Sequence, residues 1–185
     1  MKTLLYYRHS LKGTGENAQI IMQPGFDATE KTTTDEIRNI YEINHVFAGP
    51  LKRTWQTLVT ILASIQSVFC AKVHEEIAEI GSDELFNHWK GLGVKFGGKP
   101  NIDAMSDDLN SDEFTRACEN ALQGVKKMFD QMEDDETGLA VGHSPVIEMA
   151  TNRTGLSMAG QQLKENEFVI FEQDTQGNIT AHFPN

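Results

Sequence analysis

The sequence predicts an α/β fold in three layers, with helices on both faces of a mostly parallel sheet and an antiparallel hairpin at its C-terminal edge. Short apolar runs at residues 2–7, 46–48 and 139–141 alternate with longer segments of helical periodicity, which is typical of parallel sheets. Two further apolar runs, 168–171 and 179–183, flank an Asp-Thr-Gln-Gly-Asn turn. A chain of 185 residues fits a single domain of this kind.

In the first half of the chain, residues 2–7 read as a buried strand and residues 46–48, preceded by His45, as a second. Between them, residues 11–34 are rich in polar residues, Gly and Thr and have no sustained period, so we expect a long active-site loop. A helix is predicted over 51–68, followed by an extended segment over 69–73. The helix has apolar residues at spacings of three and four: Leu51, Trp55, Leu58, Leu62 and Ile65.

In the second half, residues 81–110 are expected to form another active-site loop or cap, with a short helix over 83–89 and a glycine-rich loop over 90–100. Residues 111–132 predict a long amphipathic helix, with Ser111 as its N-cap. Its apolar face comprises Phe114, Cys118, Leu122, Val125 and Phe129. Ser144 and Pro145 then form a helix-start signal after strand 139–141, because Ser caps free amides and Pro suits the first helical position.

Charge and composition exclude several classes of partner. The formal net charge is -11 and the pI about 4.9, so binding to nucleic acid or to an anionic membrane surface is not expected. The apolar stretch before Arg8 is too short for a signal-peptide core or a membrane span, which predicts a cytoplasmic protein. Cys70 and Cys118 lack metal-ligand spacing and are predicted to be buried free thiols.

Four chemically active residues follow predicted strands in different parts of the chain. Ligands of open α/β sheets bind beyond the carboxyl ends of the strands, so these segments should meet at one edge of the sheet. With Arg8 they supply two histidines, two arginines and a carboxylate, a set that suits a phosphate group. The residues concerned are His9, Arg53, Glu79 and His143.

Lys52 and Arg53 lie in the first turn of a predicted helix, where the helix dipole disfavours positive charge. A bound anion would reverse that penalty, so we assign Arg53 to the site and leave Lys52 as a solvated residue. His143 directly precedes a helix start and can address the same anion. The remaining histidines are predicted to be surface or core residues: His45, His74, His88 and His182.

Several common chemistries lack their sequence signatures. No Gly-rich loop ends in Lys-Ser or Lys-Thr, and the glycines at 91–98 do not form a dinucleotide-binding fingerprint. No histidine pair has the helical i, i+4 spacing of a zinc protease, and no serine lies in a Gly-x-Ser-x-Gly elbow. The histidines remain as candidate nucleophiles, and no metal and no cofactor are expected.

Four motifs in order resemble those of the histidine phosphatase superfamily, the group that includes cofactor-dependent phosphoglycerate mutases. Arg8 and His9 after an apolar strand resemble its Arg-His-Gly signature. Residues 49–57, Gly-Pro-Leu-Lys-Arg-Thr-Trp-Gln-Thr, resemble its Ser-Pro-Leu-x-Arg-x-x-x-Thr element. Residues 77–81, Ile-Ala-Glu-Ile-Gly, are similar to its Leu-x-Glu-x-x-Gly region with the glycine shifted, and residues 142–144 to its second histidine motif. The resemblance spans the chain and implies a phosphoglycerate mutase-like fold.

The resemblance also implies a mechanism. His9, as a neutral imidazole, would attack phosphorus in line, and water would later release phosphate from the phosphohistidine. Arg8, Arg53 and His143 would hold the phosphoryl oxygens, while Glu79 would protonate the leaving oxygen and then activate water. The protonation state of Glu79 stays open, because the arginines lower its pKa while burial and substrate charge raise it.

The chain departs from the family pattern at several positions. Ser10 replaces the usual glycine after the histidine, so its hydroxyl either alters the approach of phosphate or adds a hydrogen bond; it is placed with Ser144 among the phosphate-binding residues. Gly49 replaces a serine, which removes a polar group from the pocket. The Glu-Ser/Thr-x-x-Asn continuation of the mutases is missing from residues 11–34, where Asn17 is out of register.

The missing mutase continuation favours a metal-independent phosphatase that hydrolyses a phosphomonoester, either a small metabolite or a phosphoprotein. Two alternatives stay open: mutase-type phosphoryl transfer on a phosphoglycerate, and a non-catalytic phosphate-binding module. The physiological substrate and the oligomeric state are not predicted by the sequence.

Overall fold

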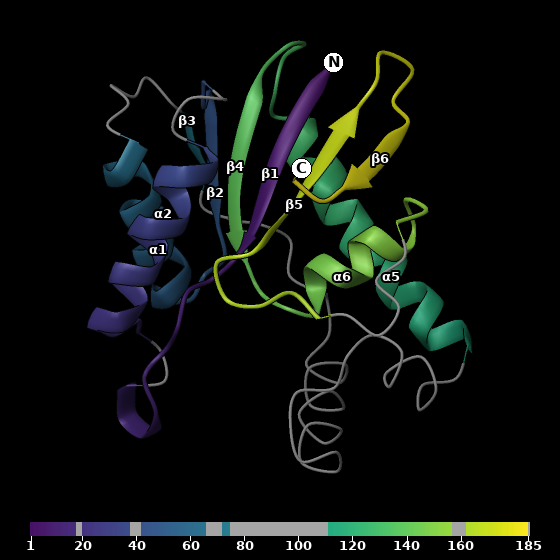
Figure 1. Ribbon diagram of the computed structural model, residues 1–185. Helices are drawn as coiled ribbons and strands as arrows, with labels where there is room; N and C mark the ends of the chain where they lie inside the picture. The colour runs from purple at the N-terminus through teal and green to yellow at the C-terminus, as the bar shows by residue number, and fades with distance from the viewer. Residues whose placement is uncertain (18–19, 38–41, 66–71, 75–110, 157–161, 185) are drawn as a thin grey trace.

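The computed structural model describes residues 1–17, 20–37, 42–65, 72–74, 111–156 and 162–184 (Figure 1). Strands and helices alternate through most of this part of the chain, and two strands end it. The elements are β1 (Lys2–Arg8), the 3-10 turn η1 (Gly15–Asn17), α1 (Gln23–Glu36), β2 (His45–Ala48), α2 (Lys52–Ile65), β3 (Lys72–His74), α5 (Ser111–Phe129), β4 (Thr137–Gly142), α6 (Val146–Asn152), β5 (Phe168–Gln173) and β6 (Ile179–His182).

The strands form one six-stranded sheet in the order β3-β2-β4-β1-β5-β6. The four strands from β3 to β1 pair in parallel, whereas β5 pairs antiparallel with β1 and β6 antiparallel with β5. The central strand β1 is in register with β4, so that Tyr6 lies opposite Ala140 and Arg8 opposite Gly142. The predicted parallel sheet with an antiparallel C-terminal hairpin is confirmed.

Two apolar cores, one on each face of the sheet, give the predicted three layers. Successive side chains of a strand point to opposite faces, so β1 contributes Leu4 and Tyr6 to one core and Leu5 and Tyr7 to the other. The first core includes the buried face of α5, with Cys118, and the second includes that of α2. Figure 1 shows α1 and α2 on one side of the sheet and α5 and α6 on the other.

The prediction of a loop over residues 11–34 was wrong for its second part, because α1 occupies Gln23–Glu36. This helix turns Gly25 and Thr29, one turn apart, toward the protein interior. Glycine and threonine are not counted as apolar residues, so this buried face produces no apolar periodicity in the sequence. The close fit at Gly25 explains its identity, since a Cβ there would lie 2.5 Å from the Leu11 carbonyl oxygen.

A second difference concerns the start of α6. Its N-cap is Pro145, without a side-chain capping hydrogen bond, whereas Ser144 was expected to cap the helix. The Ser144 hydroxyl donates instead to the Glu148 carboxyl, at 2.7 Å, and does not accept a hydrogen bond from the backbone N–H groups of the first turn.

Other predictions can be compared only in part. The predicted strands and the helices of α2 and α5 are confirmed, with ends shifted by a few residues. Cys118 is buried and free, as expected, while Cys70, Glu79 and residues 81–110 lie outside the described residues. None of the helices described combines the length and apolar character needed to cross a membrane.

Candidate active site

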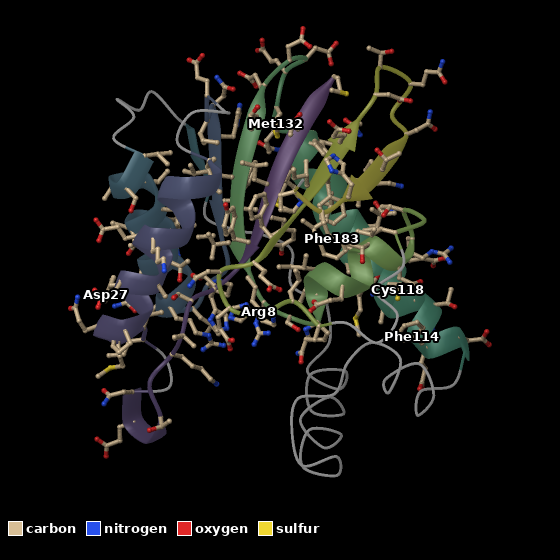
Figure 2. The ribbon with its side chains drawn as sticks, viewed as in Figure 1. Arg8, Asp27, Phe114, Cys118, Met132 and Phe183 are labelled. Atoms are coloured by element: carbon tan, nitrogen blue, oxygen red, sulfur yellow. The ribbon has the colours of Figure 1, made fainter. Side chains whose placement is uncertain are left out.

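The carboxyl ends of β1, β2 and β4 lie side by side and bring three distant segments together. The His9 N–H donates to the Gly142 carbonyl, at 3.0 Å, and the Gly49 N–H to the Val141 carbonyl, also at 3.0 Å. These bonds continue the parallel pairing one residue beyond each strand. Figure 2 shows Arg8 at this end of the sheet, between the two helical layers.

Close packing beneath the site fixes the residue before His143. A Cβ at Gly142 would lie 2.6 Å from the hydroxyl oxygen of Tyr6, whose side chain is buried in β1. Any larger residue at 142 would therefore displace either β4 or the Tyr6 ring. Gly142 lets the chain pass the ring and turn His143 toward His9.

The two histidines face one another across the site. Their ring centroids lie 5.0 Å apart with the planes inclined at 61°. His9 is buried, and its Nδ1 lies 2.7 Å from the Ser10 carbonyl oxygen. A carbonyl oxygen only accepts hydrogen bonds, so Nδ1 carries the proton and donates it. In the neutral ring Nε2 is then unprotonated, with a lone pair available for attack on an electrophile.

Ser10 anchors the segment that carries His9. Its backbone N–H donates to the Thr57 hydroxyl on α2, at 3.0 Å, and its own hydroxyl donates to the Gly25 carbonyl on α1, at 2.7 Å. The Ser10 side chain is completely buried. The hydrogen bond considered from sequence is thus made to the protein backbone, and it joins the end of β1 to the helical layer.

His143 has a strongly lowered pKa, moved from 6.5 to about 2. Burial is the largest cause, followed by repulsion from the protonated form of His9 and from the charges of Arg53, Arg8 and Lys12. Its Nε2 atom is buried and has no hydrogen-bond partner among the described residues. The imidazole is therefore neutral at physiological pH and lies in a positive field, which an anion would neutralise.

Arg8 is held by the segment that precedes β5. Its Nη1 donates to the Leu163 carbonyl and its Nη2 to a Glu165 carboxylate oxygen, at 2.8 Å. The Arg8 side chain is 4% exposed and that of Glu165 is 27% exposed, so this ion pair is partly buried. A guanidinium has five N–H groups and these bonds use two of them, while the buried Nε has no hydrogen-bond partner among the described residues.

Arg53 and Lys52 differ as the sequence predicted. Arg53 is partly buried in the first turn of α2 and contributes to the field at His143. Lys52 is exposed and is absent from the charges that act on His143. The position of Gly49 also borders the site, since a Cβ there would lie 3.7 Å from the His143 Nδ1.

The structure thus brings together Arg8, His9, Ser10, Arg53, His143 and Ser144. The Ser144 hydroxyl donates to Glu148 and accepts a hydrogen bond from the Gln162 amide, at 2.9 Å, so both of its functions are occupied by the protein. The place of Glu79 relative to these residues is outside the described part of the chain.

Sequence reasoning missed three contributors to this site. Lys12, paired with Ile21 in an isolated β-bridge, adds positive charge near His143, but a single lysine in a polar segment carries no signal. Thr57 was visible only as the last residue of the motif at 49–57. Glu148 lies five residues after His143 and appeared as an ordinary helix residue, although it is 1% exposed.

Comparison with solved structures identifies the fold. A phosphoglycerate mutase from Bacillus anthracis aligns with 98% of this chain and 91% of its own at a TM-score of 0.63 and 12% identity. The protein histidine phosphatase SixA, complexed with tungstate, aligns with 98% of this chain and 94% of its own at a TM-score of 0.60 and 13% identity. A phosphoserine phosphatase from Entamoeba histolytica, in complex with 3-phosphoglyceric acid, aligns with 100% of this chain and 98% of its own at a TM-score of 0.58 and 16% identity.

No protein-family model and no curated protein sequence matches the chain. The similarity to solved structures therefore shows that the chain has a phosphoglycerate mutase-like fold, as the sequence predicted.

Proposed function

We propose that this protein, built on the fold of the histidine phosphatase superfamily, is a phosphatase that hydrolyses a phosphomonoester through a phosphohistidine on His9. The observation that carries the proposal is the Nδ1–H hydrogen bond from His9 to the Ser10 carbonyl, at 2.7 Å. It leaves Nε2 as the nucleophilic atom of a ring that lies 5.0 Å from His143. Arg8, Arg53 and Lys12 supply the positive charge that attracts a phosphate dianion.

In the first step the His9 Nε2 forms a bond to phosphorus as the bond between phosphorus and the leaving oxygen breaks. Arg8, Arg53 and His143 stabilise the charge on the three equatorial oxygens. The leaving oxygen takes a proton, a role that the family resemblance assigns to Glu79. In the second step a water oxygen bonds to phosphorus, the N–P bond breaks, and the water proton passes to the Glu79 carboxylate.

His143 serves this chemistry because it is neutral in the free protein. A buried cation beside Arg8 and Arg53 would be costly, and the lowered pKa reports that cost. When phosphate brings negative charge into the pocket, the pKa of His143 rises, so the ring can donate a hydrogen bond from Nε2 to a phosphoryl oxygen. Binding of the substrate phosphate can thus bring about the protonation of His143.

Hydrolysis of an aryl phosphate tests the proposal. Activity is expected to persist in the presence of a chelator and to disappear in His9→Ala, because the metal-independent route needs the imidazole. His182→Ala is the control: it removes a histidine of β6, partly exposed at the far edge of the sheet, and should leave the rate unchanged. Full activity in His9→Ala would overturn the proposal.

Two results would redirect the assignment. Conversion of a 3-phosphoglycerate to the 2-phosphate in the presence of a bisphosphorylated primer would make the protein a mutase. Stabilisation by phosphate without turnover of phosphosugars, nucleotides, phosphoglycerates or phosphohistidine peptides would make it a phosphate-binding module. The same panel, with phosphoserine added, identifies the preferred substrate.

A further inference from the structure

Glu148 is a buried carboxyl group for which the proposed chemistry has no use. It lies in the first turn of α6 and is 1% exposed. Its Oε1 accepts a hydrogen bond from the Ser144 hydroxyl, at 2.7 Å, and another from the Leu163 N–H, at 3.1 Å. Its Oε2 is buried and has no hydrogen-bond partner among the described residues. A group so expensive to bury needs a structural or functional reason.

The two donors belong to two different parts of the phosphate pocket. Ser144 directly follows His143, so its bond to Glu148 restrains the turn that carries this ring. Leu163 belongs to the segment before β5, and its carbonyl accepts the hydrogen bond from Arg8 Nη1. The carboxyl therefore lies between the backbone that holds His143 and the backbone that holds Arg8.

A second connection runs parallel to the first. The Gln162 amide donates to the Ser144 hydroxyl, at 2.9 Å, and Glu165 accepts from Arg8 Nη2, at 2.8 Å. Residues 162–165 thus contact both the His143 turn and the Arg8 guanidinium. Glu148 is the one residue of α6 through which the described side chains make this link.

The surroundings of Glu148 act against its charged form. Burial raises the pKa of its carboxyl, opposed by the hydrogen bond from Ser144, the backbone hydrogen bonds and the charge of Arg8. The Ser144 hydroxyl and the Leu163 N–H both donate to Oε1, so the link between them runs through one oxygen of the carboxyl group. Arg8 already has an ion-pair partner in Glu165, and a second ionised carboxylate would weaken its attraction for phosphate.

We propose that Glu148 is a positioning residue that joins the His143 turn to segment 163–165 and so holds Arg8 and His143 at the spacing that binds phosphate. The proposal rests on the phosphate site assigned above. It requires two hydrogen bonds to one oxygen and the reach of a glutamate side chain, not a negative charge.

Two substitutions distinguish the effect of the Glu148 side-chain length from the effect of its charge. Glu148→Gln keeps the oxygen acceptor and the side-chain length but removes the acid, so its affinity for inorganic phosphate should stay within about threefold of the wild type. Glu148→Asp keeps the acid but is one methylene shorter and cannot serve Ser144 and Leu163 together. Loss of about one hydrogen bond predicts about tenfold weaker phosphate binding and a raised KM, with a smaller change in kcat.

Thr151→Val is the matched control. The buried Thr151 hydroxyl donates to the Glu148 backbone carbonyl, at 2.8 Å, in the same helix but without a link to Arg8. This variant should lower the melting temperature while phosphate affinity is unchanged. Binding is measured by calorimetric titration with inorganic phosphate, so the result does not depend on turnover.

The ranking of the variants decides the proposal. Tighter phosphate binding by Glu148→Gln than by Glu148→Asp, with Thr151→Val like the wild type, supports it. Equal affinities in all four proteins would overturn it, as would a Gln variant weaker than the Asp variant, which would assign the role to charge. If the wild-type protein binds phosphate but turns over no phosphoester, the proposed function fails while this test still stands.

Discussion

The protonation of His143 links a single residue to the stability of the protein. In the native state its pKa is about 2, against 6.5 for the ordinary side chain. Between these values the unfolded chain binds a proton on this residue that the native protein does not bind. Proton binding below pH 6.5 therefore favours the unfolded chain. The free energy of unfolding falls as the pH is lowered from about 6.5 toward 2.

We predict that acidification from about pH 7.5 to about pH 5 lowers the melting temperature of the wild type more than that of His143→Gln, because glutamine does not titrate. Phosphate bound at the proposed site should raise the pKa of His143, so inorganic phosphate is expected to reduce this excess loss. Thermal unfolding of both proteins at both pH values, with and without phosphate, measures the difference. Identical pH responses of the two proteins would contradict the lowered pKa.

At the scale of secondary structure elements, one hydroxyl group on α2 joins the helix to the end of β1. The Thr57 hydroxyl donates to the Arg53 carbonyl, at 2.8 Å, and accepts from the Ser10 N–H, at 3.0 Å. Ser10 follows the proposed nucleophile, and Arg53 is a proposed phosphate ligand. The two groups are therefore placed relative to each other by this contact.

Thr57→Val is predicted to lower kcat about tenfold and the free energy of unfolding by about 1–3 kcal/mol, because it leaves a buried N–H of Ser10 unpaired. Thr60→Val is the control, since the Thr60 hydroxyl makes the same kind of bond to a carbonyl four residues earlier, at 2.8 Å. That variant should keep the wild-type kcat. Steady-state kinetics and urea unfolding test both, and equal kcat values for the two variants would refute the positioning role.

The helices differ in how far their sequences predicted them, and the reason is what each one buries. The buried faces of α2 and α5 carry Leu58, Ile65, Val125 and Phe129, whose apolar spacing predicted both helices. The buried face of α1 includes Gly25 and Thr29, which serve hydrogen bonds and close approach. Such a helix is invisible to apolar periodicity, and the loop predicted in its place was wrong.

The site divides in the same way. Residues that follow strands, such as His9 and His143, could be placed together from sequence because parallel strands end at one edge of the sheet. The contacts of Arg8 with Glu165 and Leu163 could not, because they depend on how a distant irregular segment packs. Glu148 was missed for a related reason, since its burial follows from tertiary packing and not from its place in a helix.

On the scale of the whole molecule, the candidate site gathers segments from both halves of the chain. Residues 8–10, 49–57, 143–144 and 162–166 are joined by backbone and side-chain hydrogen bonds at one end of the sheet. The formal net charge of -11 repels anions at long range, whereas the cations around His143 attract them locally. If phosphate binds there as proposed, it should stabilise the folded protein.

The central claim is that His9 carries the phosphoryl group during turnover. Rapid quenching of a substrate reaction under alkaline conditions, followed by mass spectrometry of the peptides, locates that group directly. We predict a phosphorylated peptide that contains His9, an acid-labile modification, and its absence from His9→Ala. Turnover by the wild type with no phosphorylated His9, or with the phosphoryl group on another residue, would contradict the account.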